Sequence, residues 1–361
     1  NSLSGGDPLY VVDGTPTDIG QVNMDDVEAL SVLKGPSATA LYGNRASGGV
    51  VVITTKKAKS GEARLDINHS TTLDMIGLLP KYQNEYGGGY SQDWETFAFN
   101  PAIHPADWKS FDGQKILDYS ADESWGPKID NSPHRSAFSW QQGPEFGQLT
   151  PYSAQPNNVR DFFNKPISNN TNIAFSKGGE NFQSRVSYTH IITNGIIPNS
   201  KQTKDFLSAK NSITLLKNLT ANLNINYTST RGTNVPADNY GSSGGVLGGF
   251  NQTIGSFNQW FQRQLKIEDL KNYKNPDGTF RSWNIGGPLD PKPKYWDSPY
   301  TQMYESTNSR LDTRLFGDFG LTYQFSKHLK GSVTARRDQR QYNQEGRVAY
   351  GTLNAGGLGA F

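Results

Sequence analysis

Apolar and polar side chains alternate without a break along the segment Leu219–Thr228. Successive side chains of a β-strand point to opposite faces, so this pattern predicts a strand with one apolar face and one polar face. The segments 63–68 and 182–192 alternate in the same way, and 310–325 and 329–342 are longer runs of strand-forming residues. We therefore predict a mainly β structure with about seven strands after residue 62.

The connections between these strands fall into two length classes. Short turns are expected at Gly178–Asn181, Leu216–Asn218 and Ser326–His328, whereas long connections lie near 76–170 and 231–305. Short turns at one end of the strands and long loops at the other are typical of an outer-membrane β-barrel. A secreted β-sandwich with one solvated face gives the same alternation, so it stays open as an alternative. The segregation of the loops favours the barrel.

The composition excludes several classes of protein. The 361 residues carry 35 Lys and Arg against 33 Asp and Glu, a net charge of +2, which argues against a nucleic-acid partner. The chain has no cysteine, so a disulfide framework and thiolate chemistry are excluded. No stretch of about 18 apolar residues is present, which excludes a transmembrane helix. The first residue is Asn and the chain ends in a glycine-rich run, 356–361, so we expect a piece of a longer protein.

Residues 8–61 show a different pattern of apolar runs and turn residues from the rest of the chain. An apolar run, Leu9–Val12, ends at the turn signal Asp13-Gly14, and a β-branched run, Val50–Thr55, reads as a buried strand. We predict a small α/β unit here. About 55 residues are marginal for independent folding, so this unit is expected to pack against another part of the protein or to lack its beginning.

The tryptophans all fall in the two long connections. Such residues either pack the loops internally or form a surface for a ligand or a partner, because aromatic rings stack on sugars and pack on peptides. Self-packing is the simpler interpretation for most of them. The candidate contact residues are Trp94, Trp108, Trp125, Trp140, Trp260, Trp283 and Trp296.

No pattern in the sequence points to catalysis. The acidic pairs Asp93 with Glu95 and Asp122 with Glu123 lie near tryptophans, but nothing marks either pair as the acid and base of a glycosidase. The 5 histidines are scattered without a zinc-ligand spacing. We therefore expect neither an enzyme, a metal site nor a cofactor.

Residues 8–61 resemble the plug domain of TonB-dependent outer-membrane transporters, and within them the SusC/RagA family of Bacteroidota. The resemblance rests on the motifs PLYVVDG at 8–14, VLKGPSATALYG at 32–43 and GGVVVITTKK at 48–57. The signature positions are Pro8, Tyr10, Asp13, Gly14, Lys34, Gly35, Tyr42, Gly43 and Gly49. The segments 123–130, 156–163 and 172–200 also look like family segments.

The resemblance implies a particular division of the chain. Residues 1–61 would be the C-terminal part of the plug, and residues 62–361 would be the N-terminal portion of a transmembrane β-barrel. The family barrel has 22 strands, of which this chain would supply about the first seven. The N-terminal extension, the TonB box and the first half of the plug of a full family member are not present in this sequence.

The resemblance also implies energised import in the bacterial outer membrane. The TonB complex would act on the plug, a SusD-like lipoprotein would cover the extracellular loops, and the solute would be a glycan fragment or an oligopeptide. A SusC-like scaffold subunit of a larger surface or secretion assembly is an alternative function. A secreted glycan-binding or glycan-active β-sandwich is a second alternative, which leaves the plug resemblance unexplained.

Overall fold

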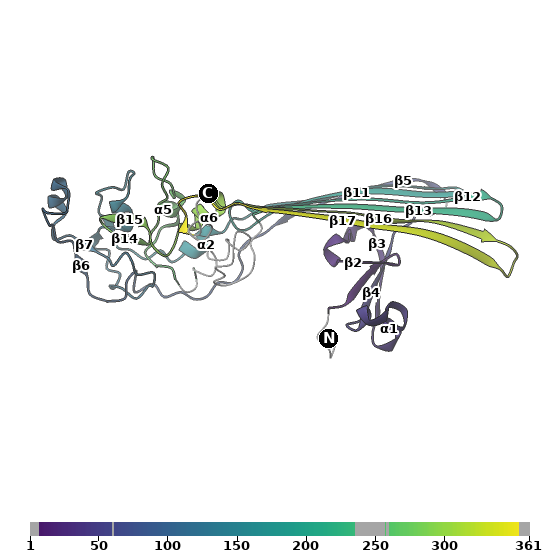
Figure 1. Cartoon of the computed structure of the whole chain (residues 1–361), viewed down its shortest axis with the longest axis horizontal. Helices are drawn as coiled ribbons and strands as arrows, with labels where there is room; N and C mark the ends of the chain where they lie inside the picture. The colour runs from purple at the N-terminus through teal and green to yellow at the C-terminus, as the bar shows by residue number, and fades with distance from the viewer. Residues whose placement is uncertain (1–6, 60, 235–256, 258–259, 354–361) are drawn as a thin grey trace.

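The computed structural model describes residues 7–59, 61–234, 257 and 260–353. Figure 1 shows three parts: a long sheet, a small N-terminal unit against one face of the sheet, and a mass of irregular chain at one end of the strands. The second long connection is described in part, because residues 235–256 and 258–259 lie outside the described residues, as do 1–6 and the glycine-rich run 356–361.

The N-terminal unit, residues 7–59, is a four-stranded sheet with one α-helix. Strand β1 (Leu9–Val12) pairs in parallel with β4 (Val50–Thr55) and antiparallel with β2 (Thr15–Thr17). Strand β3 (Val27–Leu33) pairs antiparallel with β4 on its other side, which gives the order β2-β1-β4-β3. The remaining elements are η1 (Ile19–Gln21), η2 (Met24–Asp26), α1 (Pro36–Tyr42) and η3 (Gly43–Ala46).

The long sheet is antiparallel and, within the described residues, contains seven strands in the order β17-β16-β13-β12-β11-β10-β5. Each strand therefore lies beside the next long strand along the chain. The strands are β5 (Gly61–Leu73), β10 (Ile167–Gly178), β11 (Phe182–Asn194), β12 (Lys201–Leu216), β13 (Leu219–Thr233), β16 (Asn308–Gln324) and β17 (Lys330–Gly346). The predicted period-2 segments 63–68, 182–192 and 219–228 lie within β5, β11 and β13, and the longer runs 310–325 and 329–342 extend one residue beyond β16 and β17.

The two faces of the long sheet have opposite chemistry. In β13 the side chains of Leu223, Ile225 and Tyr227 are exposed at 38%, 40% and 39%, whereas Thr228 on the other face is buried. In β11 Val186 and Tyr188 are exposed while the alternate residues 185, 187 and 189 are buried beneath the N-terminal unit. A sandwich would bury the apolar face against a second sheet. On these strands the apolar face is the exposed one, and polar residues of the opposite face are buried.

The short turns and long connections lie at opposite ends of the strands, as Figure 1 shows. The first long connection, 74–166, carries β6 (Glu95–Thr96), η4 (Ala106–Phe111), β7 (Lys115–Ile116), β8 (Pro133–His134), η5 (Ala137–Trp140), β9 (Thr150–Pro151) and α2 (Asn158–Phe162). The second, 234–307, carries α5 (Ile267–Lys271), β14 (Ile285–Gly287), β15 (Asp290–Pro293) and α6 (Pro299–Tyr304) in its described part. We call the described residues of both connections the loop body.

The helices of the described residues are short. None of them is both long and apolar enough to cross a membrane.

Candidate functional site

The turn between β1 and β2 attaches the N-terminal unit to the long sheet. Asp13 and Gly14 both have positive φ, +46° and +85°, which is the backbone of the tight turn that Asp-Gly favours between antiparallel strands. The Asp13 carboxylate accepts hydrogen bonds from the Thr55 backbone N–H at 3.1 Å and from the Thr55 hydroxyl at 2.7 Å. Lys210 Nζ of β12 lies 2.6 Å from Asp13 Oδ2. One carboxylate thus joins the turn, β4 and the sheet.

A second attachment lies beneath η2. Arg185 Nη2 of β11 is 2.7 Å from Asp26 Oδ1, and both side chains are less than a tenth exposed. The other carboxylate oxygen of Asp26 accepts hydrogen bonds from the Ser187 hydroxyl at 2.6 Å and from Asn23 Nδ2 at 2.7 Å. The neighbouring Asp25 accepts from side-chain amides of β5 and β10. Asp26 and Arg185 therefore form a buried ion pair, and the Asp26 carboxylate accepts further hydrogen bonds from neutral donors.

The third attachment involves β16 and β17, far along the chain. Gln21 Nε2 donates to Asp312 Oδ2 at 3.0 Å, and the Arg314 guanidinium donates to the hydroxyl of Thr17. Arg340 Nη1 lies 2.9 Å from Asp18 Oδ2. Polar groups therefore make the main attachments between the N-terminal unit and the sheet, and water could replace each of them if the two parts separated.

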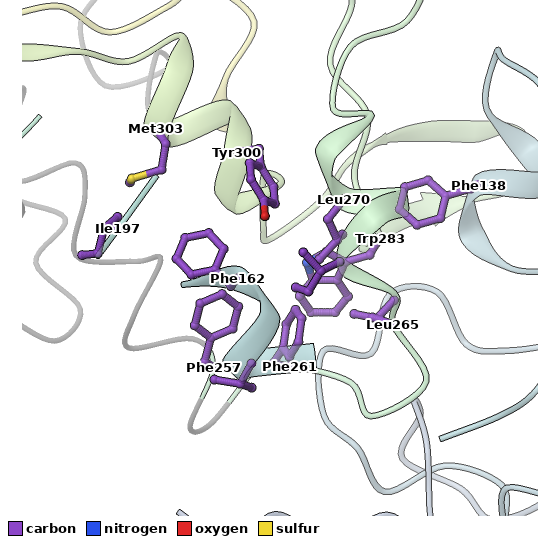
Figure 2. Close-up of a cluster of buried hydrophobic side chains, with 12 residues drawn as sticks. Phe138, Phe162, Ile197, Phe257, Phe261, Leu265, Leu270, Trp283, Tyr300 and Met303 are labelled. Carbon is purple, nitrogen blue, oxygen red and sulfur yellow. The ribbon is translucent and has the colours of Figure 1, made fainter. Parts of the chain in front are cut away.

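The loop body has its own hydrophobic core, drawn from both long connections. Phe162 of α2 packs on Phe257 with 4.8 Å between ring centroids and on Tyr300 of α6 at 5.5 Å. Figure 2 shows these rings together with Phe261 in the centre of the cluster. A second cluster, mainly from the first connection, is built around Trp108 and Trp140 and includes Ile285 of the second connection. The loops are consequently a packed body at one end of the sheet.

Arg263 connects the two long connections within the loop body. Its side chain is 3% exposed and stacks on the Tyr82 ring at 4.8 Å. The guanidinium donates to the Gln83 carbonyl at 3.1 Å, to Asn84 Oδ1 at 2.9 Å and to Asn158 Oδ1 at 2.6 Å. Two further acceptors are the carbonyl oxygens of Gln155 and Pro156. A single residue of the second connection thus binds two segments of the first, 82–84 and 155–158.

Comparison with known proteins agrees with this arrangement. Residues 1–50 match the family model described as the TonB-dependent receptor plug domain. The chain is 27% identical over 304 residues to the TonB-dependent receptor SusC of Bacteroides thetaiotaomicron, a match that covers 79% of this chain and 25% of that protein. It is 25% identical over 330 residues to the TonB-dependent receptor P3 of Formosa agariphila, covering 91% of this chain and 26% of that protein.

Solved structures share the fold. The structure of the RagAB peptide transporter matches with a TM-score of 0.63 and 19% identity, and the match covers 94% of this chain and 35% of that chain. This chain is part of a SusC/RagA-like TonB-dependent receptor. It spans about a quarter of the length of the curated relatives it matches. TonB-dependent receptors are outer-membrane β-barrels and are transporters rather than enzymes, so the chain belongs to the bacterial outer membrane.

The signature positions of the receptor cluster around the N-terminal sheet. Tyr10 packs against the small core of Val12, Val22 and Ile53, and Tyr42 packs against the core on the other side of the sheet. Pro8 precedes β1, and Lys34 follows β3 on the surface. The glycines have positive φ: Gly14 +85°, Gly35 +62°, Gly43 +68° and Gly49 +97°. Among the signature residues, Asp13 contacts the long sheet through its ion pair with Lys210.

The tryptophans of the receptor divide by exposure. Trp108, Trp140 and Trp283 are buried in the two loop cores. Trp94, Trp260 and Trp296 are half-buried, and Trp296 Nε1 donates to Asp122 Oδ2 at 2.7 Å. Trp125 is exposed at 57% and lies 5.5 Å from the Tyr86 ring. Among the seven candidates, it is the one with an exposed indole.

Sequence reasoning missed the basic residues that hold the receptor together. Arg185, Lys210 and Arg340 lie on the polar face of the sheet, and the period-2 pattern places each on that face. A lysine or arginine on the buried polar face of a strand indicates that the part of the protein packed on that face supplies an acidic side chain. Arg263 has no comparable signal, because it lies in an irregular segment.

Two buried groups of the loop body have shifted pKa values. Burial raises the pKa of Asp297 to about 6, although Gln302 Nε2 donates to its carboxylate at 2.7 Å. Burial lowers the pKa of His134 to about 4, although Nδ1 lies 2.9 Å from the Thr150 carbonyl oxygen. Burial favours the uncharged form of either group. Acidification therefore favours the folded loop body through Asp297 and disfavours it through His134.

We expect Asp297→Asn to change how loop-body stability depends on pH. The folded pKa of about 6 exceeds the ordinary aspartate value of 3.8, so the contribution of Asp297 is fully present below about pH 4 and is lost as the pH rises through 6. Asn does not titrate, so the stability of the variant relative to wild type should rise by up to about 3 kcal/mol between pH 4 and pH 7. Thermal unfolding of both detergent-solubilised proteins across this pH range measures the difference in stability. A difference that does not change with pH would contradict the raised pKa of Asp297.

Proposed function

We propose that this chain is the C-terminal part of the plug, residues 1–61, and the first seven strands of a 22-stranded barrel, residues 62–361, of an importer driven by TonB. The observation that carries the proposal is the distribution of side chains on the long sheet, which is the reverse of that in a water-soluble protein. Its exposed face is apolar, as a lipid-facing wall requires, and its covered face is polar, as a water-filled lumen requires. The N-terminal unit on that polar face would then lie inside the lumen.

The same geometry disfavours the secreted β-sandwich. A soluble protein rarely exposes a large contiguous apolar surface, yet the outer face of the sheet presents one from β5 to β16. Examples on it are Ile67, Phe175, Tyr227 and Phe319, exposed at 66%, 46%, 39% and 46%. Such a face is stable in lipid, not in water.

We further propose that the solute is a glycan fragment or an oligopeptide, captured beneath a SusD-like lipoprotein on the loop body. The similar RagAB structure is described as a peptide importer, which supports the peptide alternative. The glycan alternative and the lipoprotein lid rest on the resemblance to the SusC/RagA family. The loop body lies at the end of the strands opposite the short turns, which is the extracellular end in outer-membrane barrels. Its packed cores would hold a binding surface in place.

Trp125 is the residue we propose for direct contact with the solute or the lid. We expect Trp125→Ala to weaken surface binding of the cargo about tenfold, because an aromatic ring contact is worth about 0.5–1.5 kcal/mol beyond the area that it buries. Phe325→Ala is the matched control: Phe325 is equally exposed, at 62%, but lies at the short-turn end of the strands. Binding of labelled oligosaccharide and oligopeptide mixtures to cells carrying the native receptor measures both.

The import function itself has a separate test. Uptake should require both the receptor and the inner-membrane proton gradient, and a collapsed gradient should leave surface binding intact. If the receptor binds neither mixture and supports no uptake, but co-purifies with a stable assembly of other surface proteins, the scaffold function replaces import.

A further inference from the structure

The exposed apolar face of the long sheet ends, towards the loop body, in a row that contains two tyrosines. Tyr188 of β11 and Tyr227 of β13 both pair across the strands with Leu207 of β12, and all three side chains are exposed. Aromatic side chains form girdles at both membrane interfaces of an outer-membrane barrel. This row therefore indicates where lipid chains give way to lipid head groups on the side of the loop body.

Two basic side chains lie beyond this row on the same face of the sheet. Lys201 shares β12 with Leu207, and Arg231 shares β13 with Tyr227. Each pair of positions differs by an even number, which keeps both cations on the exposed face. Arg231 pairs across the strands with Thr203, two positions from Lys201. The two cations are therefore diagonal neighbours, with Cα atoms about 7–8 Å apart, and both are exposed.

The positive charge of this pair is only partly offset by the protein. Among the described residues, neither Lys201 nor Arg231 forms an ion pair. Asp205 lies on the same face, diagonal to Arg231, but its carboxylate has other partners. Asp205 Oδ1 accepts a hydrogen bond from the Tyr188 hydroxyl at 2.7 Å and lies 2.7 Å from His190 Nδ1. The two cations therefore remain available to an anion from outside the chain.

The position and the chemistry of the pair fit the phosphate group of a lipid. Four residues separate Arg231 from Tyr227, about 14 Å along the strand, and the tilt of barrel strands reduces this to about 10 Å along the membrane normal. Long basic side chains can also extend back towards the interface. A guanidinium binds phosphate through two parallel hydrogen bonds, and the hydroxyls of Thr203 and Thr233 lie on the same face as further donors.

We propose that Lys201 and Arg231 bind the phosphate group of a lipid in the outer leaflet, with Thr203 and Thr233 as hydroxyl donors. The chains of this lipid lie along the apolar face of β12 and β13, so one molecule contacts both the apolar and the basic part of the surface. The bound head group holds these two strands at one depth in the membrane. This inference rests on the lipid-facing wall proposed above and does not depend on import.

Two lipids that differ only in the phosphate test the proposal. The native receptor, purified from outer membranes and depleted of lipid in detergent, is titrated with phosphatidic acid or with diacylglycerol of the same chains, and native mass spectrometry counts the bound lipid. We expect wild type to bind phosphatidic acid at least tenfold more tightly than diacylglycerol, since each basic side chain near the membrane surface attracts anionic lipid. The double variant Lys201→Gln, Arg231→Gln should lose most of this preference. The matched control Lys109→Gln, Lys292→Gln removes two exposed cations of the loop body and should retain it.

The outcomes separate this inference from import. An equal preference for phosphatidic acid in the double variant and in the control overturns the lipid site, whatever the uptake assay shows. Displacement of phosphatidic acid by an equal concentration of inorganic phosphate also overturns it, because the pair would then bind free phosphate rather than a lipid. A wild-type receptor that imports neither oligosaccharide nor oligopeptide, but keeps a phosphate preference that the double variant loses, supports the lipid site and overturns import alone.

Discussion

Replacement of Arg263 by Met should unfold the loop body without unfolding the sheet. The guanidinium is buried and donates to acceptors in two segments of the first long connection, among them Gln83, Asn84 and Asn158. Met fills much of the same volume but donates nothing, so these buried oxygens lose their partners. Since each hydrogen bond to a charged group is worth about 1.5–3 kcal/mol, we expect about 3–5 kcal/mol less stability in the loop body.

Hydrogen exchange and limited proteolysis of the native receptor in detergent measure this effect. Protection should fall across 74–166 and the described part of 234–307 and stay unchanged in the seven strands of the long sheet. Arg160→Met is the matched control, because Arg160 is exposed and donates to a single carbonyl, that of Ile76, at 3.1 Å. Equal protection in the Arg263 and Arg160 variants would show that Arg263 does not hold the two connections together.

Replacement of Arg185 by Met should loosen the N-terminal unit from the sheet. The variant leaves the Asp26 carboxylate buried without its cation, and removal of one partner from a buried ion pair costs about 3–5 kcal/mol. Asp26 retains the Ser187 and Asn23 donors, so we expect a value near the lower end. The N-terminal unit should become sensitive to protease at concentrations that leave the wild-type receptor intact.

A double variant and a surface control make this result specific. Adding Asp26→Leu to Arg185→Met removes the unpaired charge, so much of the lost stability should return. Arg64→Met breaks the exposed pair of Arg64 and Asp66, for which we expect a change of no more than about 1 kcal/mol. A double variant no more stable than Arg185→Met alone would mean that the buried charge is not the cause.

The strands of the long sheet could be predicted from the sequence because their side-chain period is 2 and one face is apolar. Leu219–Thr228 lies within β13, and the short turns at 178–181, 216–218 and 326–328 lie at the ends of long strands. The alternation of apolar and polar residues does not predict which face of the sheet is buried. In the structure the polar face is the buried one: Arg185 and Thr189 are buried, whereas Leu223 and Ile225 on the apolar face are exposed.

The contacts between distant parts of the chain could not be predicted in the same way. Asp18 and Arg340 are separated by 322 positions, and no local pattern couples an aspartate in one turn to an arginine in a late strand. The positions of the tryptophans could be read from the sequence, but their burial could not. Trp108 and Trp125 both lie in irregular chain, yet one is in a core and the other is exposed. The burial of each tryptophan depends on how the loop residues pack, and such packing produces no periodic pattern in the sequence.

The separation between Gln21 and Asp312, 291 positions, has a consequence for the order of folding. Contacts between residues so far apart form late, because the intervening chain must first be brought into place. The N-terminal unit leaves the ribosome and crosses the inner membrane before the strands that hold it, since its attachment to Arg340 waits for β17. During that interval its acidic side chains have no cations from the sheet. Docking of the N-terminal unit is therefore expected to be a slow kinetic phase that follows strand assembly, although the unit is synthesised first.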